Sequence, residues 1–205
     1  MQGFEIRRGW LVAARHRASP NCNERPAGSI VDTLVVHGIT LPPGCFGGSH
    51  VDALFANQLD PAAHPFFAQV ASLRVSAHVF IARTGALTQY VSFTERAWHA
   101  GRSHFAGRDN VNDFAIGVEL EGTDDCPYSV AQYRRLGWLA ATLMRHYPAL
   151  VRARIVGHSD IAPGRKTDPG PAFDWQRFDR ALVAAGREAV NTASPGTPTC
   201  DGDSS

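Results

Sequence analysis

The sequence predicts a single α/β domain with a central mixed β-sheet flanked by helices. Short β-branched runs alternate with longer segments of helical periodicity, and a β-hairpin pattern lies mid-chain. The chain has 205 residues and 44% hydrophobic content, enough for one core. We expect this domain to span residues 1–187, and the Ser-, Thr-, Pro- and Gly-rich residues 188–205 to form a disordered C-terminal tail.

In the first half of the chain, apolar runs between Pro- and Gly-rich loops predict strands. Two of these runs flank Thr84 and Gly85, a pattern typical of a β-hairpin. The expected strands are residues 10–14, 33–36, 76–82 and 86–91, and the expected short helices are residues 50–57 and 61–71.

Residues 115–121 predict another strand, in which period-2 alternation places Glu119 and Glu121 on one face. A long helix follows, for which Ser129 and Gln132 form a capping box and Pro148 marks the end. We then expect a strand over residues 154–157 and a last helix that Asp174 caps.

Composition excludes several classes of function. The net charge is +1, so no broad basic field favours nucleic acid or an anionic membrane. Neither a glycine-rich phosphate loop nor a G-x-S-x-G elbow is present. No signal-peptide pattern or membrane-spanning run is visible, so we expect a cytoplasmic protein and interpret the four scattered cysteines as free thiols.

Two histidines and an aspartate form a candidate metal site. His37 and His158 each lie at the end of a predicted buried strand, and Asp168 lies on the loop after His158. Two imidazoles and one carboxylate leave a fourth tetrahedral position open, as in catalytic zinc sites. Residue type and position alone leave this hypothesis open against a structural role, and His78 could be a third imidazole ligand or a hydrogen-bonded core residue.

Lys166 is the single lysine among 20 Lys and Arg residues, and it lies between His158 and Asp168. Arginine replaces lysine readily on a solvated surface, but less readily where a compact ammonium must face developing negative charge. The alternative is that one lysine remained here by chance in an arginine-rich chain.

Several segments together carry a resemblance to a known family, and its most specific block is residues 158–174. The other segments are Leu34-Val35-Val36-His37, Leu41-Pro42-Pro43-Gly44, Phe46-Gly47-Gly48, His64-Pro65-Phe66-Phe67, Leu73-Arg74-Val75-Ser76-Ala77-His78, Arg96-Ala97-Trp98-His99-Ala100-Gly101 and Gly117-Val118-Glu119-Leu120-Glu121-Gly122-Thr123. From about residue 9 to about residue 182, the chain resembles the cytoplasmic AmpD-type 1,6-anhydro-N-acetylmuramyl-L-alanine amidases. These enzymes belong to the zinc amidase superfamily, which also includes peptidoglycan recognition proteins and phage amidases.

The resemblance implies roles for individual residues. His37, His158 and Asp168 match the Zn²⁺ ligands, Glu119 the catalytic carboxylate, and Lys166 the basic residue that stabilises the oxyanion. A neighbouring metal charge disfavours a protonated ammonium, so we expect solvation or a carboxylate near Lys166. Glu121 shares the face of Glu119, and we interpret it as a surface residue or as one that contacts the metal ligands without binding the metal itself.

The resemblance also implies substrate-binding residues. Arg74 matches an arginine that contacts a peptide carboxylate, with a solvated strand-edge arginine as the alternative. Trp98 and His99 match a segment that lines the substrate groove, although Trp98 could equally anchor the core. Two positions depart from the family pattern, Gly38 for the usual Asn and Asn110 for an expected arginine, and we hypothesise that Arg108 compensates.

The resemblance therefore implies a zinc-dependent N-acetylmuramoyl-L-alanine amidase. Its expected reaction is hydrolysis of the amide between 1,6-anhydro-N-acetylmuramic acid and L-alanine in cytoplasmic peptidoglycan recycling. The expected partner is a small muropeptide substrate, without nucleic acid or membrane, and the expected state is a monomer. The alternatives are a non-catalytic, receptor-like muropeptide-binding module and an amidase acting on intact peptidoglycan.

Overall fold

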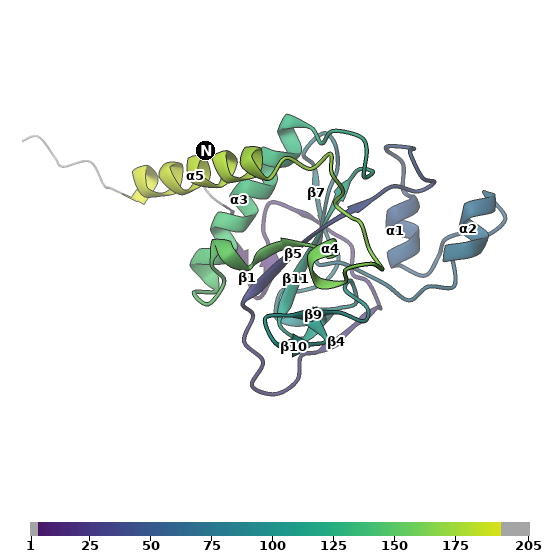
Figure 1. Ribbon diagram of the computed structural model, residues 1–205, viewed down its shortest axis with the longest axis horizontal. Helices are drawn as coiled ribbons and strands as arrows, with labels where there is room; N and C mark the ends of the chain where they lie inside the picture. Colours follow the sequence, from purple (N-terminus) through teal and green to yellow (C-terminus); the bar gives the residue numbers. More distant parts are fainter. Residues whose placement is uncertain (1–3, 194–205) are drawn as a thin grey trace, which may run out of the picture.

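The computed structural model describes residues 4–193, and its centre is a six-stranded sheet of strand order β12-β5-β11-β6-β7-β3 (Figure 1). Strands β12, β5, β11 and β6 are parallel, β7 is antiparallel to β6, and β3 is parallel to β7. This mixed sheet confirms the predicted fold class. The strands are β3 (Arg15–His16), β5 (Thr33–Ile39), β6 (Val79–Ile81), β7 (Leu87–Gln89), β11 (Ala115–Glu121) and β12 (Ile155–Gly157).

The remaining strands form two-stranded ribbons around this sheet. They are β1 (Ile6–Arg7) with β2 (Trp10–Leu11), β4 (Cys22–Glu24) with β8 (Glu95–Ala97), and β9 (His104–Phe105) with β10 (Arg108–Asp109). The single strand predicted over residues 10–14 is wrong, because a turn closed by the Ala14 N–H and the Leu11 carbonyl separates β2 from β3. The predicted hairpin is confirmed by β6 and β7, although both strands are shorter than expected.

Helix α3 (Val130–His146) has the predicted capping box. The Ser129 hydroxyl accepts from the Gln132 N–H at 3.1 Å, and the Gln132 side chain accepts from the Ser129 N–H at 2.9 Å. Helix α5 (Trp175–Ala193) begins after Asp174, whose carboxylate accepts from the Arg177 N–H at 2.8 Å. The two helices lie side by side (Figure 1) and approach closely at Gly137, where a Cβ would lie 2.7 Å from the Ala181 carbonyl carbon.

Helix α5 continues past residue 188, where the tail was expected to begin. Residues 194–205, the rest of that expected tail, lie outside the described residues. No helix in the described part of the chain is long and apolar enough to cross a membrane. Cys22, Cys45 and Cys126 are free thiols, as predicted, whereas Cys200 also lies outside the described range.

The shorter helices lie at both ends of the parallel strands, because η1 and η2 precede β11 and β12 whereas α1 and α4 follow β5 and β12. The predicted helix over residues 61–71 starts later than expected, because residues 61–63 form a turn and Pro65 occupies the first helical position behind the cap residue His64. The short helices are α1 (His50–Phe55), α2 (Pro65–Val70), η1 (Val111–Asp113), η2 (Arg152–Arg154) and α4 (His158–Ile161).

Alternation along β5 and β11 divides the sheet into an apolar face and a face that carries polar groups. One face packs into a single hydrophobic cluster with α3 and α5, through Leu34, Val36, Ile116, Val118 and Leu120. The opposite face carries the buried side chains of His37, Glu119 and Glu121. The polar groups are therefore held on two adjacent interior strands, β5 and β11.

Candidate active site

Three ligand-type atoms from distant parts of the chain meet at the carboxyl edge of the sheet. His37 Nδ1 lies 2.9 Å from His158 Nδ1 and 3.2 Å from Asp168 Oδ2, and His158 Nδ1 lies 3.0 Å from Asp168 Oδ2. Ligands of a tetrahedral zinc ion at about 2.0–2.1 Å are separated by about 3.3 Å. The donor set and its spacing therefore fit a zinc ion.

The outer ring nitrogens of the two histidines show which atoms face the centre. His158 Nε2 lies 3.2 Å from the Ala100 carbonyl, which can only accept, so Nε2 carries the proton and Nδ1 presents its lone pair. His37 Nε2 lies 3.0 Å from His99 Nδ1. Burial lowers the pKa of His37 to about 4, which keeps this imidazole in the neutral form that binds a metal.

Asp168 is delivered by the loop that follows α4. Its carbonyl accepts from the Ser159 N–H at 3.0 Å, and the next carbonyl, of Pro169, accepts from the Tyr128 hydroxyl at 2.9 Å. Burial alone would raise the pKa of Asp168, but its contacts with His158 and His37 hold that pKa well below its usual range. Asp168 is therefore an anion at neutral pH and could serve as a metal ligand.

Glu119 supplies a second carboxyl group on the same face of the sheet. Its side chain is buried, and Oε2 has no hydrogen-bond partner within residues 4–193. Burial raises the pKa of Glu119 well above its usual value, the charge of Asp168 adds to this, and Lys166 opposes it. A buried carboxyl group with a raised pKa in a cleft is typical of a residue that carries protons.

Lys166 lies on the exposed part of the same loop as Asp168 and lines the cleft. Water can therefore solvate the ammonium group of Lys166, as expected. Its backbone N–H donates to the Ala162 carbonyl at 3.1 Å. This hydrogen bond fixes the backbone of Lys166 close to the candidate metal ligands.

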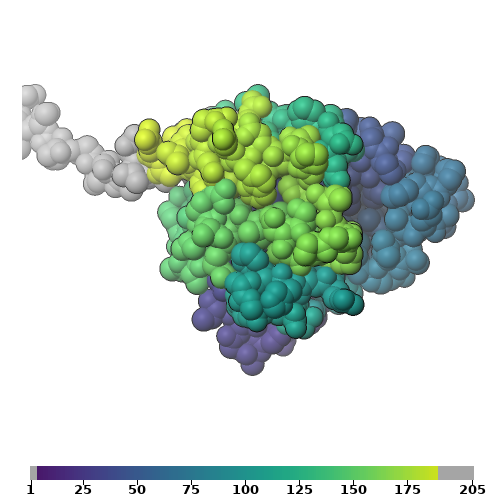
Figure 2. Space-filling model, viewed as in Figure 1, coloured from purple at the N-terminus to yellow at the C-terminus, as the bar shows by residue number. Residues whose placement is uncertain are grey.

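A cleft of about 630 Å³ opens over these groups. One wall is the loop of residues 165–168, and the other is apolar and comes from α1, α2 and the segment after them. Figure 2 shows both walls on the same face of the molecule, with residues near 160–170 in light green and α1 and α2 in blue. The volume lies in the range of small-molecule sites. The apolar wall consists of Leu54, Phe55, Phe66, Val70, Leu73 and Val75.

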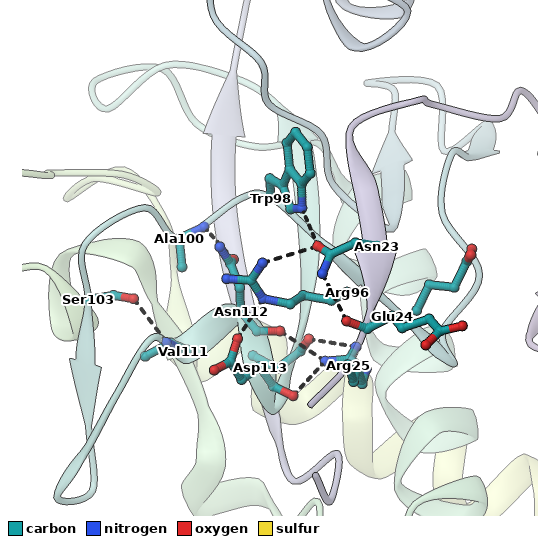
Figure 3. Close-up of polar contacts among 12 residues, drawn as sticks. Asn23, Glu24, Arg25, Arg96, Trp98, Ala100, Ser103, Val111, Asn112 and Asp113 are labelled. Carbon is teal, nitrogen blue, oxygen red and sulfur yellow. Dashed lines mark hydrogen bonds and ion pairs between the residues drawn. The ribbon is translucent and has the colours of Figure 1, made fainter. Parts of the chain in front are cut away.

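The predicted substrate-binding residues are distributed differently. His99 lines the cleft, but its Nδ1 atom contacts His37. Arg74 is exposed between two cleft residues, Leu73 and Val75. Trp98 is half-buried outside the cleft lining of the described chain, and its indole N–H donates to Asn23 at 2.7 Å (Figure 3).

Arg108 lies away from this group. Its guanidinium pairs with Asp32 at 2.6 Å and lies 3.7 Å from the centre of the Phe114 ring. Asp32 immediately precedes β5, whereas His37 lies toward the carboxyl end of that strand. The structure therefore places Arg108 near the amino end of β5, away from the cluster of His37, His158 and Asp168.

Both departures from the expected pattern have a structural reason. A Cβ at residue 38 would overlap the hydroxyl of Tyr128, the residue that holds the loop carrying Asp168. Asn110 has a φ of +56°, a left-handed conformation that asparagine tolerates better than most residues. Gly38 thus makes room for Tyr128, and Asn110 suits the turn that precedes η1.

The alternatives for His78 and Glu121 are also resolved. His78 is a core histidine whose Nδ1 accepts from the Gly117 N–H at 3.0 Å, and it is not part of the ligand group. Glu121 is buried, so its interpretation as a surface residue is wrong. Its carboxylate accepts from the backbone N–H groups of Gly47 and Arg83 and anchors two loops.

Asn112 contributes to the site without any signal in the sequence pattern. Its side-chain oxygen accepts from the N–H groups of His99 and Ala100, the two residues that contact the outer nitrogens of the imidazole ligands. Only the fold brings these segments together, so neither periodicity nor motif spacing could identify Asn112.

Comparison with known families identifies what this site resembles. Residues 27–171 match the family model described as N-acetylmuramoyl-L-alanine amidase. The chain belongs to this family. The amidase is 57% identical over 177 residues to the 1,6-anhydro-N-acetylmuramyl-L-alanine amidase AmpD of Salmonella typhimurium (strain SL1344), covering 86% of this chain and 94% of that protein. It is 55% identical to the AmpD of Escherichia coli (strain K12), covering 87% of this chain and 97% of that protein.

Solved structures of relatives have the same architecture. The amidase matches the crystal structure of a selenomethionine AmpD derivative with a TM-score of 0.85 and 52% identity, covering 87% of this chain and 99% of that one. It also matches AmpDh3 from Pseudomonas aeruginosa in complex with anhydromuramic pentapeptide, with a TM-score of 0.59 and 31% identity. That match covers 78% of this chain and 62% of the other.

Proposed function

We propose that this amidase uses zinc to hydrolyse the amide between 1,6-anhydro-N-acetylmuramic acid and L-alanine in muropeptides. The observation that carries the proposal is the convergence of His37, His158 and Asp168 in one cleft with Glu119, whose Oε2 has no hydrogen-bond partner among the described residues. The near full-length similarity to relatives named for this reaction supports the choice of substrate.

Each residue has a role in the proposed mechanism. His37 and His158 would hold zinc through Nδ1, and Asp168 through Oδ2. When bound, the ion acts as a Lewis acid that makes hydroxide accessible near neutral pH. Glu119 accepts the proton of the attacking water through Oε2 and transfers it to the nitrogen of L-alanine as the amide bond breaks. Lys166 Nζ stabilises the negative charge that develops on the carbonyl oxygen.

The cleft also suits the shape of the proposed substrate. Its apolar wall provides a surface for the sugar ring and lactyl methyl group, whereas Arg165 on the opposite wall suits a peptide carboxylate. The relative that binds anhydromuramic pentapeptide supports a ligand of this size. Roles of Arg74, Trp98, His99 and Arg108 in substrate binding stay predictions, and the Michaelis constants of their alanine variants test them.

We further propose that the amidase acts as a monomer in the cytoplasm, on released fragments of peptidoglycan. Mass spectrometry of products from anhydro-muramyl tripeptide and from intact peptidoglycan tests this substrate choice. Cleavage of the tripeptide alone supports recycling of fragments, whereas preferential cleavage of the intact polymer favours the alternative amidase. Tight binding of the tripeptide without any cleavage favours the receptor-like alternative. Light scattering of the purified protein tests the monomer.

A further inference from the structure

The segment His99–Ala100 contacts the outer nitrogens of both imidazole ligands. His99 Nδ1 lies 3.0 Å from His37 Nε2, and the Ala100 carbonyl lies 3.2 Å from His158 Nε2. Two adjacent residues thus set the ring orientation of two ligands that are 121 positions apart in the sequence. An acceptor on the outer nitrogen fixes the tautomer and keeps the other nitrogen free for the metal.

One side chain fixes this segment. Asn112 is 6% exposed, and its Oδ1 accepts from the His99 N–H at 3.1 Å and from the Ala100 N–H at 2.8 Å. Figure 3 shows the Asn112 side chain directed at Ala100 from the neighbouring 3-10 helix η1. Both peptide N–H groups are buried and would lose their acceptor if this oxygen were removed.

Asn112 is itself held in place by a buried arginine. The Arg25 guanidinium donates to the carbonyls of Asn112 at 2.9 Å, Asp113 at 3.1 Å and Ala115 at 3.0 Å (Figure 3). Burial lowers the pKa of Arg25 to about 10, so it stays charged at neutral pH. The Val111 N–H also donates to the Ser103 hydroxyl at 3.1 Å. The Asn112 oxygen is therefore attached to a rigid support.

The position of the His99 ring depends on a glycine. A Cβ at Gly117 on β11 would lie 2.6 Å from His99 Nδ1, so only glycine leaves room for the ring over this strand. The ring meets His37 edge to face, with the centroids 5.0 Å apart. Asn112 holds the backbone of His99 and Gly117 accommodates its ring.

We propose that Asn112 is a positioning residue for the metal centre, which orients both imidazole ligands through the backbone of His99 and Ala100. This inference rests on the proposed zinc site. Loss of a partner to an outer ligand nitrogen typically weakens metal binding about 10–100-fold. Because Asn112 acts on two ligands at once, removal of its side-chain oxygen is expected to reduce zinc affinity within or above that range.

The test measures the dissociation constant for Zn²⁺ by competition with a chromophoric chelator, using the full chain. Asn112→Ala is expected to bind zinc about 10–100-fold more weakly than the wild type. Asn112→Asp keeps an accepting oxygen at the same place and is expected to restore most of the affinity. Asn21→Ala is the matched control, because Asn21 is also buried and anchors loops through the carbonyls of Val75 and Phe55.

A second variant and a spectroscopic readout keep the test decisive if Asn112→Ala folds poorly. Gly117→Ala displaces the His99 ring and is expected to weaken zinc binding by a similar factor. In ¹⁵N spectra of the zinc-loaded wild type, the ring-nitrogen signals of His37 are expected to show a proton on Nε2. These signals are expected to change in Asn112→Ala and in Gly117→Ala.

Two results would overturn the inference. One is wild-type zinc affinity in a folded Asn112→Ala protein, and the other is an equal loss in Asn21→Ala, which would indicate a general effect of stability. Failure of this inference alone leaves a wild-type protein that binds zinc and cleaves substrate. Failure of the proposed function gives a wild-type protein that binds no zinc or that binds zinc and does not cleave the substrate.

Discussion

Glu119 and His37 are register partners on two adjacent interior strands, because β11 and β5 run parallel and pair these residues directly. Both side chains therefore project from the same face of the sheet toward the same cleft. His158 arrives at the adjacent edge at the end of β12, which pairs with β5 on its other side. The pairing of three strands thus fixes the position of Glu119 relative to His37 and His158.

The first prediction concerns Glu119 as the proton carrier. Glu119→Gln keeps the size of the side chain but cannot accept the proton of water, so kcat is expected to fall by about 10²–10⁴-fold. Zinc affinity is expected to remain close to that of the wild type. Glu121→Gln is the control, since Glu121 shares the strand and face but bonds two loop amides. Wild-type turnover in Glu119→Gln would contradict the assigned role.

The second prediction concerns the stability of the zinc-free protein as a function of pH. Burial raises the pKa of Glu119 in the folded state, whereas in the unfolded chain this group ionises near its usual value. The unfolded state therefore releases this proton first, and Glu119 lowers stability as the pH rises between the two pKa values. Glu119→Gln removes this effect.

We accordingly expect zinc-free Glu119→Gln to be more stable than zinc-free wild type at neutral pH. The difference should disappear below about pH 4, where Glu119 is protonated in both states. Urea unfolding in the presence of a chelator, at several pH values, measures the difference in unfolding free energy between the two proteins. A difference of the same size at every pH would show that ionisation of Glu119 is not the cause.

The third prediction concerns Lys166. Lys166→Ala removes the positive charge near the developing oxyanion, and kcat is expected to fall by about 10²–10³-fold. Because Lys166 is exposed, its loss is expected to leave the thermal midpoint almost unchanged. Lys166→Arg is expected to recover part of the rate, since a guanidinium keeps the charge but not the compact shape. Unchanged kcat in Lys166→Ala would exclude this role.

The fourth prediction concerns Gly38 and Tyr128. Gly38→Ala places a methyl group against the Tyr128 hydroxyl, and this overpacking is expected to cost about 1–3 kcal/mol of unfolding free energy. Tyr128→Phe removes the clashing hydroxyl, so Gly38→Ala is expected to be much less harmful in that background. A double-mutant cycle by chemical denaturation measures the coupling. Additive effects would show that the two residues do not compete for this space.

The sequence was most informative where local signals and burial agree. The strand Ala115–Glu121 and the capping box at Ser129 appear as predicted, because alternation and capping are local properties. The convergence of His37, His158 and Asp168 needed the family resemblance as well, since their spacing along the chain does not define their distance in space.

The parts that the sequence could not predict depend on tertiary contacts. Arg108 lies close to Asn110 in the sequence and was expected to compensate for the missing arginine, but it pairs with Asp32 at the far end of the strands. Gly38 departs from the expected pattern because Tyr128, 90 positions away, occupies the space beside it. Asn112 bonds to backbone amides, and nothing in its neighbouring residues indicates which amides these are.

The most direct test of the account is hydrolysis of anhydro-muramyl tripeptide, followed by mass spectrometry before chelation, after chelation and after addition of zinc. The account predicts free anhydro-N-acetylmuramic acid and intact tripeptide as products, loss of both with chelator, and recovery with zinc. Cleavage that continues at the same rate in the fully chelated protein, or zinc binding without any release of peptide, would contradict it.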